Sequence, residues 1–466
     1  MHATKIWAIT LIGLVSGMPA AQAQWTGMTD GPNEYVSTLC YDSLNDRLYA
    51  FGRFLEAGGQ VVNGTTFLED GQWHPMGEGV ENVFAWSVMD AYLRNDSVMI
   101  SGAFNTLVGV PNTKRIALWN GSEWKSIGGL GGNGNAAGML ANEDGWTMAG
   151  GFTEMGGIPS NSIARYRNGE WEDLCVYPDN SGYKHYSALA KYQGQYIFGG
   201  NINGDFPDLN EIGVLLNDSL RPMGSGILGD SWVNDMKVYD GKLFVGGEFY
   251  AGWGNPGSGI MIWDGENWSD PIPGVQCATQ VFDMDVFDGK LFFSGYMLLP
   301  GSSDFYTLAM YTPGQICLFG KNLTAAMNAI AGVPGGLYVA PNYPDLVVDG
   351  VPLGVLALYD ISQGFDTCLS LPVGIGEPEW TDDRRLHIHP NPNYGTFQVD
   401  LPAGFKAQQV VVYDALGNEV DLMAKARAPG TGSISVELQA RVPGIYLVRI
   451  SGSDGATYLT GRVIVH

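Results

Sequence analysis

Positive charge is scarce in this chain. Its 466 residues include 24 Lys and Arg against 48 Asp and Glu, a formal net charge of −24. Such a surplus of negative charge repels phosphate and excludes a nucleic-acid-binding protein. No apolar run approaches the roughly 20 residues that a membrane-spanning helix needs. The 5 cysteines form no Cys-x-x-Cys pair, so the usual spacing of a zinc site is absent.

Groups that usually carry out catalysis are also few. Between residues 24 and 372 the only histidines are His74 and His185, too few for a copper-radical site or a histidine-based triad. No Gly-x-x-x-x-Gly-Lys loop is present to hold a phosphate. Acidic residues are plentiful, but no pair stands out by the spacing of a glycosidase. The sequence therefore predicts no catalytic residue, and an enzyme is the less favoured alternative.

Glycine and aromatic residues are abundant. The chain has 66 Gly, 12% aromatic residues and 45% hydrophobic residues. This composition is typical of a turn-rich, all-β protein, and it excludes a disordered chain. The length allows two or three domains.

The first 23 residues have the pattern of a secretory signal peptide. Lys5 gives a basic start, Ile6 to Val15 is apolar, and Ala21-Gln22-Ala23 is a small-x-small cleavage site. We expect the mature chain to begin at Gln24 outside the cytoplasm. Disulfides are permitted there, and an odd number of cysteines leaves at least one outside any internal bridge, with the pairing open.

A repeat of 46 to 50 residues runs from residue 24 to about 372. In the first column a glycine ends a β-like segment, and Pro341 takes its place in the degraded seventh copy. The six glycines are Gly52, Gly102, Gly150, Gly200, Gly247 and Gly295. A second column follows 20 to 22 residues later: Trp73, Trp124, Trp171, Leu220, Trp268 and Ile316. Two columns in register indicate one structural unit repeated seven times.

Each unit resolves into four short strands. The first two are joined by tight turns such as Asp240-Gly241, in which glycine supplies the positive φ of a hairpin. A loop of about ten residues leads to a third strand, and the tryptophan column opens a fourth. Four antiparallel strands per repeat predict one blade of a β-propeller, and seven repeats predict seven four-stranded blades over residues 24–372.

The repeat resembles the kelch-type propeller family, in a divergent bacterial form. The likeness is clearest at Ala149-Gly150-Gly151 with Tyr166 and Trp171. It implies a propeller architecture and leaves activity open. The strand that closes the ring is ambiguous: Gln24 to Met28 matches Gln72 to Met76, a fourth strand, but Asp366 to Pro372 could fill the same place.

Composition changes after residue 372. Residues 373–385 have turn formers and charges without alternation and predict a linker. Residues 386–466 alternate like strands and predict a small immunoglobulin-like β-sandwich. This segment resembles the type A sorting domain of the type IX secretion system in its order of motif residues: Pro390, Asn391, Pro392, Gly395, Gly417, Gly444 and Tyr446.

The resemblance implies export in two steps. The signal peptide would bring the chain to the periplasm, and the sorting domain would engage the type IX machinery for passage across the outer membrane. It implies that the protein is secreted or held on the outer cell surface, with no transmembrane segment. Cleavage of the domain is usual in this family, but the cleavage site is left open.

Three aspartates are candidates for a metal site in the propeller channel. Asp90, Asp235 and Asp283 stand twelve residues before their repeat glycines, on the strand expected to line the channel. Carboxylate oxygens of this kind could hold calcium. The alternative is a hydrated channel lining, and no other cofactor is predicted.

Aromatic and acidic residues gather in the segments expected at the loop face, the end of the propeller that carries the connections between second and third strands and the links between blades. These candidates for ligand binding are Tyr183, His185, Asp205, Phe206, Asp208, Tyr250, Trp253, Phe305 and Tyr306. An aromatic ring beside a hydrogen-bond acceptor suits a sugar or a peptide. The alternative is that these rings fold back over the blade ends.

The sequence thus favours a secreted, non-catalytic propeller that binds protein or glycan through its loop face. Two alternatives remain: an enzyme acting on an extracellular polysaccharide or protein, and a structural element of the envelope. Binding predicts that alanine at Trp253 or Tyr306 weakens affinity without changing the melting temperature.

Overall fold

The structure of the protein is a computed structural model of the 466-residue chain. It describes residues 24–371, apart from 85–86, 130, 175–184, 203–208, 218, 345 and 349, and residues 386–465, apart from 392, 402–404, 406, 414–419, 424–431, 440–441, 443 and 453–457. The chain divides into two compact units, Met1–Pro372 and Val373–His466. The predicted signal peptide and linker lie outside the described residues. In the described part, no helix has the length and apolar character to cross a membrane.

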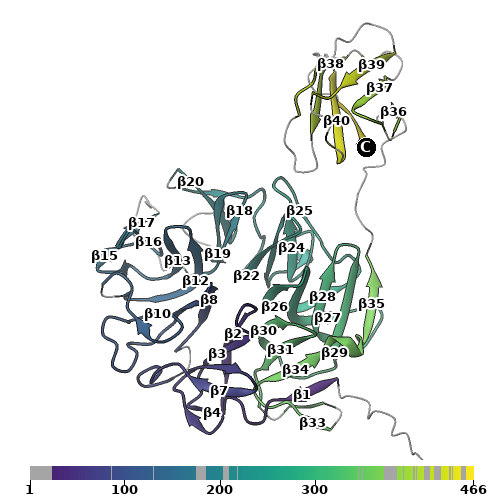
Figure 1. Cartoon of the computed structure of the whole chain (residues 1–466). Coiled ribbons are helices and arrows are strands. Elements are labelled where there is room, and N and C mark those ends of the chain that lie inside the picture. Colours follow the sequence, from purple (N-terminus) through teal and green to yellow (C-terminus); the bar gives the residue numbers. More distant parts are fainter. Residues whose placement is uncertain are drawn as a thin grey trace, which may run out of the picture. The chain divides into compact units, whose positions relative to one another are not determined.

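The described part of the first unit contains seven antiparallel sheets of four or five strands, each started by an inner strand, and three two-stranded sheets (Figure 1). Sheets one to three are β2 (Val36–Asp42), β3 (Arg47–Gly52), β6 (Thr65–Glu69), β7 (Gln72–Pro75); β8 (Asp90–Arg94), β9 (Ser97–Ser101), β10 (Ile116–Trp119), β11 (Trp124–Lys125); and β12 (Asn135–Asn142), β13 (Gly145–Gly151), β16 (Ile163–Arg167), β17 (Glu170–Asp173). Sheets four and five are β18 (His185–Tyr192), β19 (Gln195–Asn201), β20 (Ile212–Leu216), β21 (Ser219–Pro222); and β22 (Trp232–Tyr239), β23 (Lys242–Glu248), β24 (Ile260–Trp263), β25 (Trp268–Ser269). Sheet six is β26 (Gln276–Phe287), β27 (Lys290–Leu298), β28 (Phe305–Thr312), β29 (Gln315–Lys321) and β35 (Thr367–Ser370). Sheet seven is β30 (Met327–Val333), β31 (Gly336–Pro341), β34 (Ala357–Asp360) and β1 (Trp25–Gly27).

The inner strands pack against one another around the unit. Each of β2, β8, β12, β18, β22 and β26 contacts the inner strand of the following sheet, and β30 contacts β2 again. The ring is therefore closed, with apolar clusters between successive sheets. Sheets set radially around a central channel are the architecture of a β-propeller.

Both segments proposed for ring closure form strands, but in different sheets. Strand β1 pairs with β34, with Trp25 opposite Tyr359, and completes sheet seven. Strand β35 instead adds a fifth strand to the edge of sheet six, where Cys317 and Cys368 form a disulfide. The N-terminal segment therefore closes the ring, and the chain leaves the propeller from sheet six.

The glycine column is explained by close contact with the inner strand. In six sheets, the first to the sixth, a Cβ on this glycine would lie 2.0–2.7 Å from a backbone carbonyl oxygen of the neighbouring strand, as at Gly247 against Trp232. At this level the inner strand carries a β-bulge in six of the seven sheets. In the first six sheets the carbonyl of the inner strand leaves no room for a Cβ, so only glycine fits there.

The tryptophan column joins neighbouring sheets. The Nε1 of Trp124 donates to the Met76 carbonyl oxygen at 2.6 Å, and the Nε1 of Trp268 donates to that of Met223 at 2.7 Å. Both carbonyls belong to the link that leaves the preceding sheet. The outer-strand tryptophans thus satisfy link carbonyls while their rings are largely covered.

The second unit contains two three-stranded sheets with a shared apolar core. One is formed by β36 (His387–His389), β37 (Thr396–Asp400) and β39 (Ser433–Glu437), the other by β38 (Ala407–Tyr413), β40 (Gly444–Gly452) and β41 (Tyr458–Val465). Phe397 and Val436 from the first sheet and Val448 from the second are buried in one cluster.

Candidate functional site

A central cavity of about 660 Å³ runs between the seven inner strands and is lined by residues of all of them. Its size falls in the range of roughly 300–1,000 Å³ typical of small-ligand sites. The inner strands start at the loop face, so successive residues of each strand line the channel in layers. We number these layers from the loop face inward.

The first layer, which we call the rim, precedes the cavity-lining residues on the loop-face side of each inner strand. Its members are the residues whose carbonyl oxygens face the repeat glycines: Tyr35, Ser87, Asn135, His185, Trp232 and Gln280. Ser87 is buried and offers no surface to the channel. The second layer lies two residues further along each strand and lines the cavity: Ser37, Met89, Ala137, Ser187, Asn234, Phe282 and Asn328. Neither layer contains an Asp, Glu, Lys or Arg. Burial lowers the pKa of His185, so its imidazole is neutral near neutral pH.

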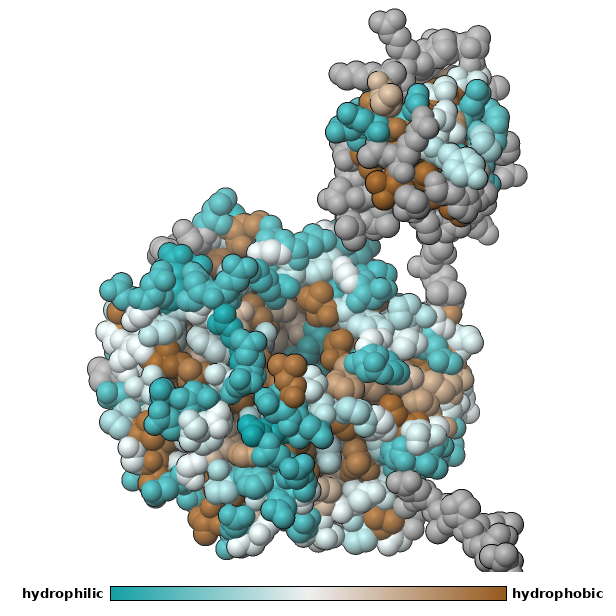
Figure 2. All heavy atoms as spheres, in the orientation of Figure 1, coloured by the Kyte–Doolittle hydropathy of each residue, from teal (hydrophilic) through white to brown (hydrophobic). Residues whose placement is uncertain are grey.

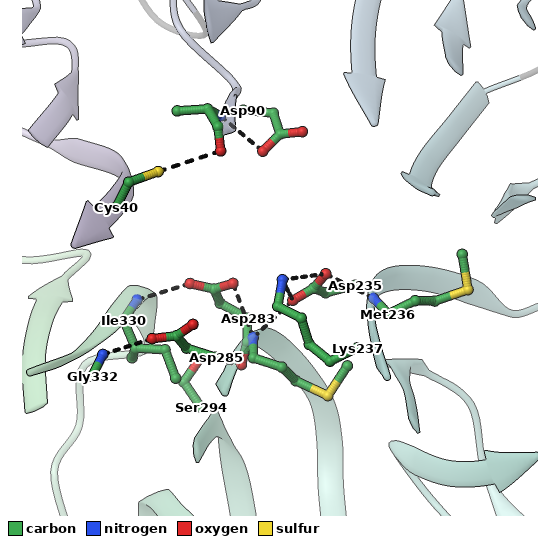
Figure 3. A network of polar contacts seen from close by, with 12 residues as sticks. Cys40, Asp90, Asp235, Met236, Lys237, Asp283, Asp285, Ser294, Ile330 and Gly332 are labelled. Carbon is green, nitrogen blue, oxygen red and sulfur yellow. Dashed lines mark hydrogen bonds and ion pairs between the residues drawn. The ribbon is translucent and has the colours of Figure 1, made fainter. Parts of the chain in front are cut away.

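Most charged residues of the channel lie further along the strands, in a third layer with Asp90, Asp235 and Asp283 and a fourth layer with Lys237 and Asp285. Lys191 also lines the cavity, still further along its strand. The Lys237 ammonium is 3.0 Å from Asp235 Oδ2, and Asp283 lies on its other side (Figure 3). Burial alone would lower the pKa of Lys237, but Asp235, Asp283 and Asp285 together raise it above its ordinary value. Burial raises the pKa of Asp283 and of Asp285. Lys237 is therefore a fixed cation among carboxylates.

Asp90 stands apart from this group, across the opening in Figure 3. Its Oδ1 accepts from the Ala91 backbone N–H at 2.8 Å. Burial raises the pKa of Asp90 to about 7, an effect only partly offset by Lys237. The carboxyl group is thus partly protonated at neutral pH. Cys40, beside Asp90, is a free cysteine. Burial raises the pKa of its thiol, which favours the protonated form.

The geometry does not support the predicted calcium site. Asp90, Asp235 and Asp283 do line the same channel, but Lys237 already supplies positive charge between two of them. Within the described ranges no group of three or more His, Cys, Asp or Glu side chains is placed to hold a metal ion. Lys237 was not predicted from the sequence because it lies two residues beyond the aspartate column.

The aspartates instead connect neighbouring sheets. Asp235 Oδ2 accepts from the Met284 N–H at 3.0 Å, and Asp283 Oδ2 accepts from the Ile330 N–H at 2.8 Å. Asp285 Oδ2 accepts from the Gly332 N–H at 2.7 Å. Each of these acids satisfies a backbone donor of the next inner strand. Such structural use leaves them poorly placed for acid–base catalysis.

Serine and asparagine side chains of the second layer satisfy the backbone acceptors. Ser37 Oγ donates to the Val88 carbonyl at 2.6 Å, and Asn234 Nδ2 donates to the Val281 carbonyl at 2.7 Å. Ser187 donates to the carbonyl of Val233 in the same way. The channel-facing edges of these inner strands are therefore used by side chains of the preceding sheet.

Two predicted aromatic residues lie together at the loop face of sheet five. The Tyr250 and Trp253 rings meet edge to face, with centroids 4.7 Å apart. Asn255 fixes this turn through bonds to Leu228 and to the Tyr250 carbonyl, and Gly229 leaves space for the Trp253 ring. Trp253 is 42% exposed. Because its ring also packs against Tyr250 and over Gly229, it forms an exposed aromatic surface in a fixed position. Apolar residues otherwise form scattered patches on the visible face of the larger unit (Figure 2).

The prediction for Tyr306 was wrong. Phe305 and Tyr306 lie in strand β28 rather than in a loop, because sheet six is extended and Leu298 pairs with Phe305. Tyr306 is only 5% exposed and packs in the core between sheets. Phe305 is half-buried against Tyr296, with ring centroids 5.8 Å apart. The candidates Tyr183, Asp205, Phe206 and Asp208 lie outside the described residues.

His185 belongs to the rim, where the structure adds residues that the sequence did not single out. Its ring lies 5.1 Å from that of Trp232, whose Nε1 donates to Ser187 Oγ at 2.9 Å. Gln280 Oε1 accepts from Asn234 Nδ2 at 3.2 Å, and Tyr35 OH accepts from Asn328 Nδ2 at 3.1 Å. The rim residues could have been found from the sequence by their position. They stand fifteen residues before the repeat glycine, or seventeen in the first repeat.

The predicted sorting-motif residues organise the start of the second unit. Asn391 Oδ1 accepts from the Ile464 N–H at 2.8 Å, which ties the motif to the last strand. Gly395 has a φ of 88°, and its carbonyl accepts from the Leu438 N–H. Tyr446 is buried and donates to the Val442 carbonyl at 2.6 Å. Gly444 begins β40, Pro390 follows β36, and Pro392 and Gly417 lie outside the described residues.

Comparison with solved structures finds chains that are similar only at low identity. PorZ, described as an essential surface component of the type-IX secretion system of Porphyromonas gingivalis, is 13% identical over 92% of this chain and 70% of PorZ, with a TM-score of 0.30. The propeller domain of the Trilobed protease from Pyrococcus furiosus is 11% identical over 66% of this chain and 91% of that domain, with a TM-score of 0.39. A protein of unknown function from Bacteroides thetaiotaomicron is 13% identical over 70% of this chain and 90% of its own, with a TM-score of 0.32. Such distant likenesses carry no argument about activity.

No curated protein matches the chain. The family model for the secretion system C-terminal sorting domain matches residues 387–466. This is the segment whose motif residues and two sheets are described above. The chain therefore carries a type IX secretion system C-terminal sorting domain and is secreted to the cell surface or the extracellular space.

Proposed function

We propose that this protein is a non-catalytic binding module, displayed outside the cell, that binds extracellular protein or glycan through the loop face of its propeller. The observation that carries the proposal is Trp253, a large ring that is 42% exposed yet held rigidly by Tyr250 and the Asn255 hydrogen bonds. A rigid, exposed tryptophan provides contact area at little cost in conformational entropy.

The finer architecture belongs to the same proposal. We infer a divergent kelch-like propeller of seven blades over residues 24–372, a linker over 373–385 and an immunoglobulin-like sandwich over 386–466. Closed packing of the seven inner strands supports the blade count. Two three-stranded sheets around one core support the sandwich. A cleaved signal peptide over residues 1–23 would start the export that the sorting domain completes.

The non-catalytic part of the proposal rests on how the channel carboxylates are used. Asp235, Asp283 and Asp285 each accept a backbone N–H of the next sheet, and Lys237 neutralises part of their charge. An acid and base pair for hydrolysis needs carboxyl groups free to reach a substrate. Asp90, whose pKa burial raises to about 7, is the one observation that favours the enzyme alternative.

The test uses the secreted full chain with immobilised polysaccharides and matrix proteins, scoring co-sedimentation and new product ends in the same tubes. We expect saturable retention without products. Trp253→Ala should weaken retention about tenfold with little change in melting temperature. The matched control is Leu44→Ala, which removes a 79% exposed side chain between β2 and β3, at the other end of the channel.

Two results would overturn the proposal. Equal retention of the Trp253→Ala variant would show that the loop face of sheet five is not the contact surface. New product ends that disappear in Asp90→Asn would make the protein an enzyme acting on an extracellular polymer.

A further inference from the structure

The upper channel differs in chemistry from the rest of the propeller. Residues 24–372 contain 38 acidic and 15 basic residues, yet no Asp, Glu, Lys or Arg is present in the first two channel layers. The second layer lines a cavity of about 660 Å³, and the first layer adjoins it through the bonds of Trp232 to Ser187 and of Gln280 to Asn234. Together they offer aromatic rings and amide or hydroxyl groups at the loop-face end of the inner strands. The carboxylates of the third and fourth layers lie directly beneath them. The site is therefore polar and uncharged at its entrance and negative below.

Ring surfaces lie on one side of this entrance. Trp232 is half-buried and bridges sheets five and four, where it contacts the His185 ring and donates to Ser187. Phe282 lines the cavity and is half-exposed, 6.1 Å between ring centroids from Tyr296. Flat apolar faces of this kind pack against the C–H faces of a sugar ring.

Amide groups lie on three neighbouring inner strands, β22, β26 and β30, with part of their hydrogen-bonding capacity in use. Asn234 donates through Nδ2 to Gln280 and to the Val281 carbonyl, which fixes the orientation of both amides. Asn328 is fixed by its bond to Tyr35 OH. Each amide has a second polar atom that can still bond to a ligand, because an amide carries both donors and an acceptor. Fixed amides beside rings match the alternating hydroxyl groups of a saccharide.

The same geometry disfavours a peptide. An extended peptide binds by pairing its backbone with a free strand edge. Here the carbonyls of Val88, Val233 and Val281 already accept side-chain hydrogen bonds from the preceding sheet. The N–H groups of Met284 and Ile330 are likewise occupied by aspartates. These inner-strand edges have little backbone left for a peptide to pair with.

From this arrangement we propose that the rim and second layer of the channel form a binding site for an uncharged saccharide, whose terminal residues enter the channel from the loop face. The proposal rests on the proposed binding function and names its ligand class. The carboxylates beneath the site select against anionic sugars such as uronic acids, because the ligand would have to bring negative charge close to Asp90, Asp235 and Asp283.

The test is titration of the secreted full chain with two matched sets of probes, followed by calorimetry and tryptophan fluorescence. One set contains uncharged gluco-, manno- and galacto-oligosaccharides, and the other contains uronic-acid oligosaccharides of the same length. We expect at least one uncharged probe to bind, and to bind about tenfold or more tightly than the uronic-acid probes.

Variants locate the site. Trp232→Ala should weaken binding of the uncharged probe about tenfold, and Gln280→Ala several-fold. Trp232→Phe keeps a ring and should retain more affinity than Trp232→Ala, which separates loss of the ring from loss of folding. Leu44→Ala is the control. Each variant is first compared with the wild type by its melting temperature.

The outcomes separate this inference from the proposed function. Binding of an uncharged probe with the same affinity in Trp232→Ala and Gln280→Ala as in the wild type would leave the proposed function standing and overturn the channel site. Equal affinity for uronic-acid probes, or no binding of any uncharged probe, would also overturn it. Failure of every glycan and protein to bind would overturn both.

Discussion

Asp90 is the channel residue whose protonation should be visible in stability. Its pKa rises from 3.8 to about 7 on folding because it is buried. A carboxyl group with a raised folded pKa favours the folded state most below pH 3.8, and this contribution is lost as pH rises to about 7. Asp90 therefore makes the protein less stable at higher pH.

Asp90→Asn should remove this pH dependence. Asparagine keeps an oxygen to accept the Ala91 N–H but carries no charge. Relative to the wild type, the variant should gain about 1–2 kcal/mol in free energy of unfolding between about pH 5 and pH 8, less than the full shift because Asp90 faces the channel. Urea unfolding at both pH values measures this, with exposed Asp240→Asn as the control. Parallel pH curves for variant and wild type would show that Asp90 is not desolvated.

The charge of Lys237 stabilises the folded protein at neutral pH, unlike that of Asp90. Lys237→Met should leave Asp235, Asp283 and Asp285 without their cation, so unfolding free energy should fall by about 1–3 kcal/mol at neutral pH. The loss should shrink as pH falls, since protonated carboxyl groups need no counter-charge. Lys191→Met is the matched control, because Lys191 also lines the cavity but lies over the Tyr196 ring. A similar loss in both variants would assign the effect to side-chain packing.

At the scale of the strand, the repeat glycine determines how closely two strands can approach. A Cβ at Gly247 would lie 2.0 Å from the Trp232 carbonyl oxygen, a backbone atom that cannot move aside. Gly247→Ala should therefore cost about 2 kcal/mol or more. Gly252→Ala is the control, since nothing lies within 4 Å of its Cβ position. Thermal unfolding of the two variants measures the difference, and equal melting temperatures would contradict the steric explanation.

The disulfide acts at the scale of a whole sheet. Cys317 and Cys368 are 51 residues apart, and the chain between them contains strands β30, β31 and β34 of sheet seven. Closing a loop of this length typically contributes about 2–4 kcal/mol. We expect reductant to lower the melting temperature of the wild type and to leave Cys368→Ser unchanged. If reductant lowered both equally, another disulfide would be responsible.

Much of the strand order could be predicted from the sequence, because each repeat contains its own turns and its own glycine and tryptophan positions. Ring closure could not. Trp25 and Cys368 lie in segments with equally strand-like patterns, and both segments do form strands, on different sheets. The choice depends on which sheet edge is open, a property of the assembled ring.

The candidate site was less predictable for two physical reasons. A bulge in six inner strands shifts the alternation of side chains, so counting residues by twos does not reveal that Asn234 and Asp235 both line the channel. The longer turn after Asp42 also shifts the first repeat by two positions, so Cys40 belongs to the layer of Lys237 rather than that of Asp235. Tyr306 is buried because strands β27 and β28 of sheet six are extended, and no local sequence pattern predicts this extension.

At the scale of the whole molecule, the two units differ sharply in charge. Residues 24–372 contain 38 acidic and 15 basic residues, a net charge of −23, whereas residues 386–466 contain 6 of each. A strongly negative unit repels other acidic surfaces and remains soluble outside the cell. The sorting domain lacks this net charge.

This division predicts that sorting and binding can be separated. A chain that ends at residue 372 keeps every strand of the propeller, including β35 and its disulfide, and should fold. Because it lacks residues 387–466, it should accumulate inside the cell envelope instead of on the surface or in the medium. Val436→Asp, which places a charge in the buried core of the sorting domain, should have the same effect in an otherwise intact chain. Fractionation with immunoblotting measures both variants against Leu44→Ala, which should be secreted normally. Secretion of the shortened chain at the wild-type level would mean that the propeller itself carries a second export signal.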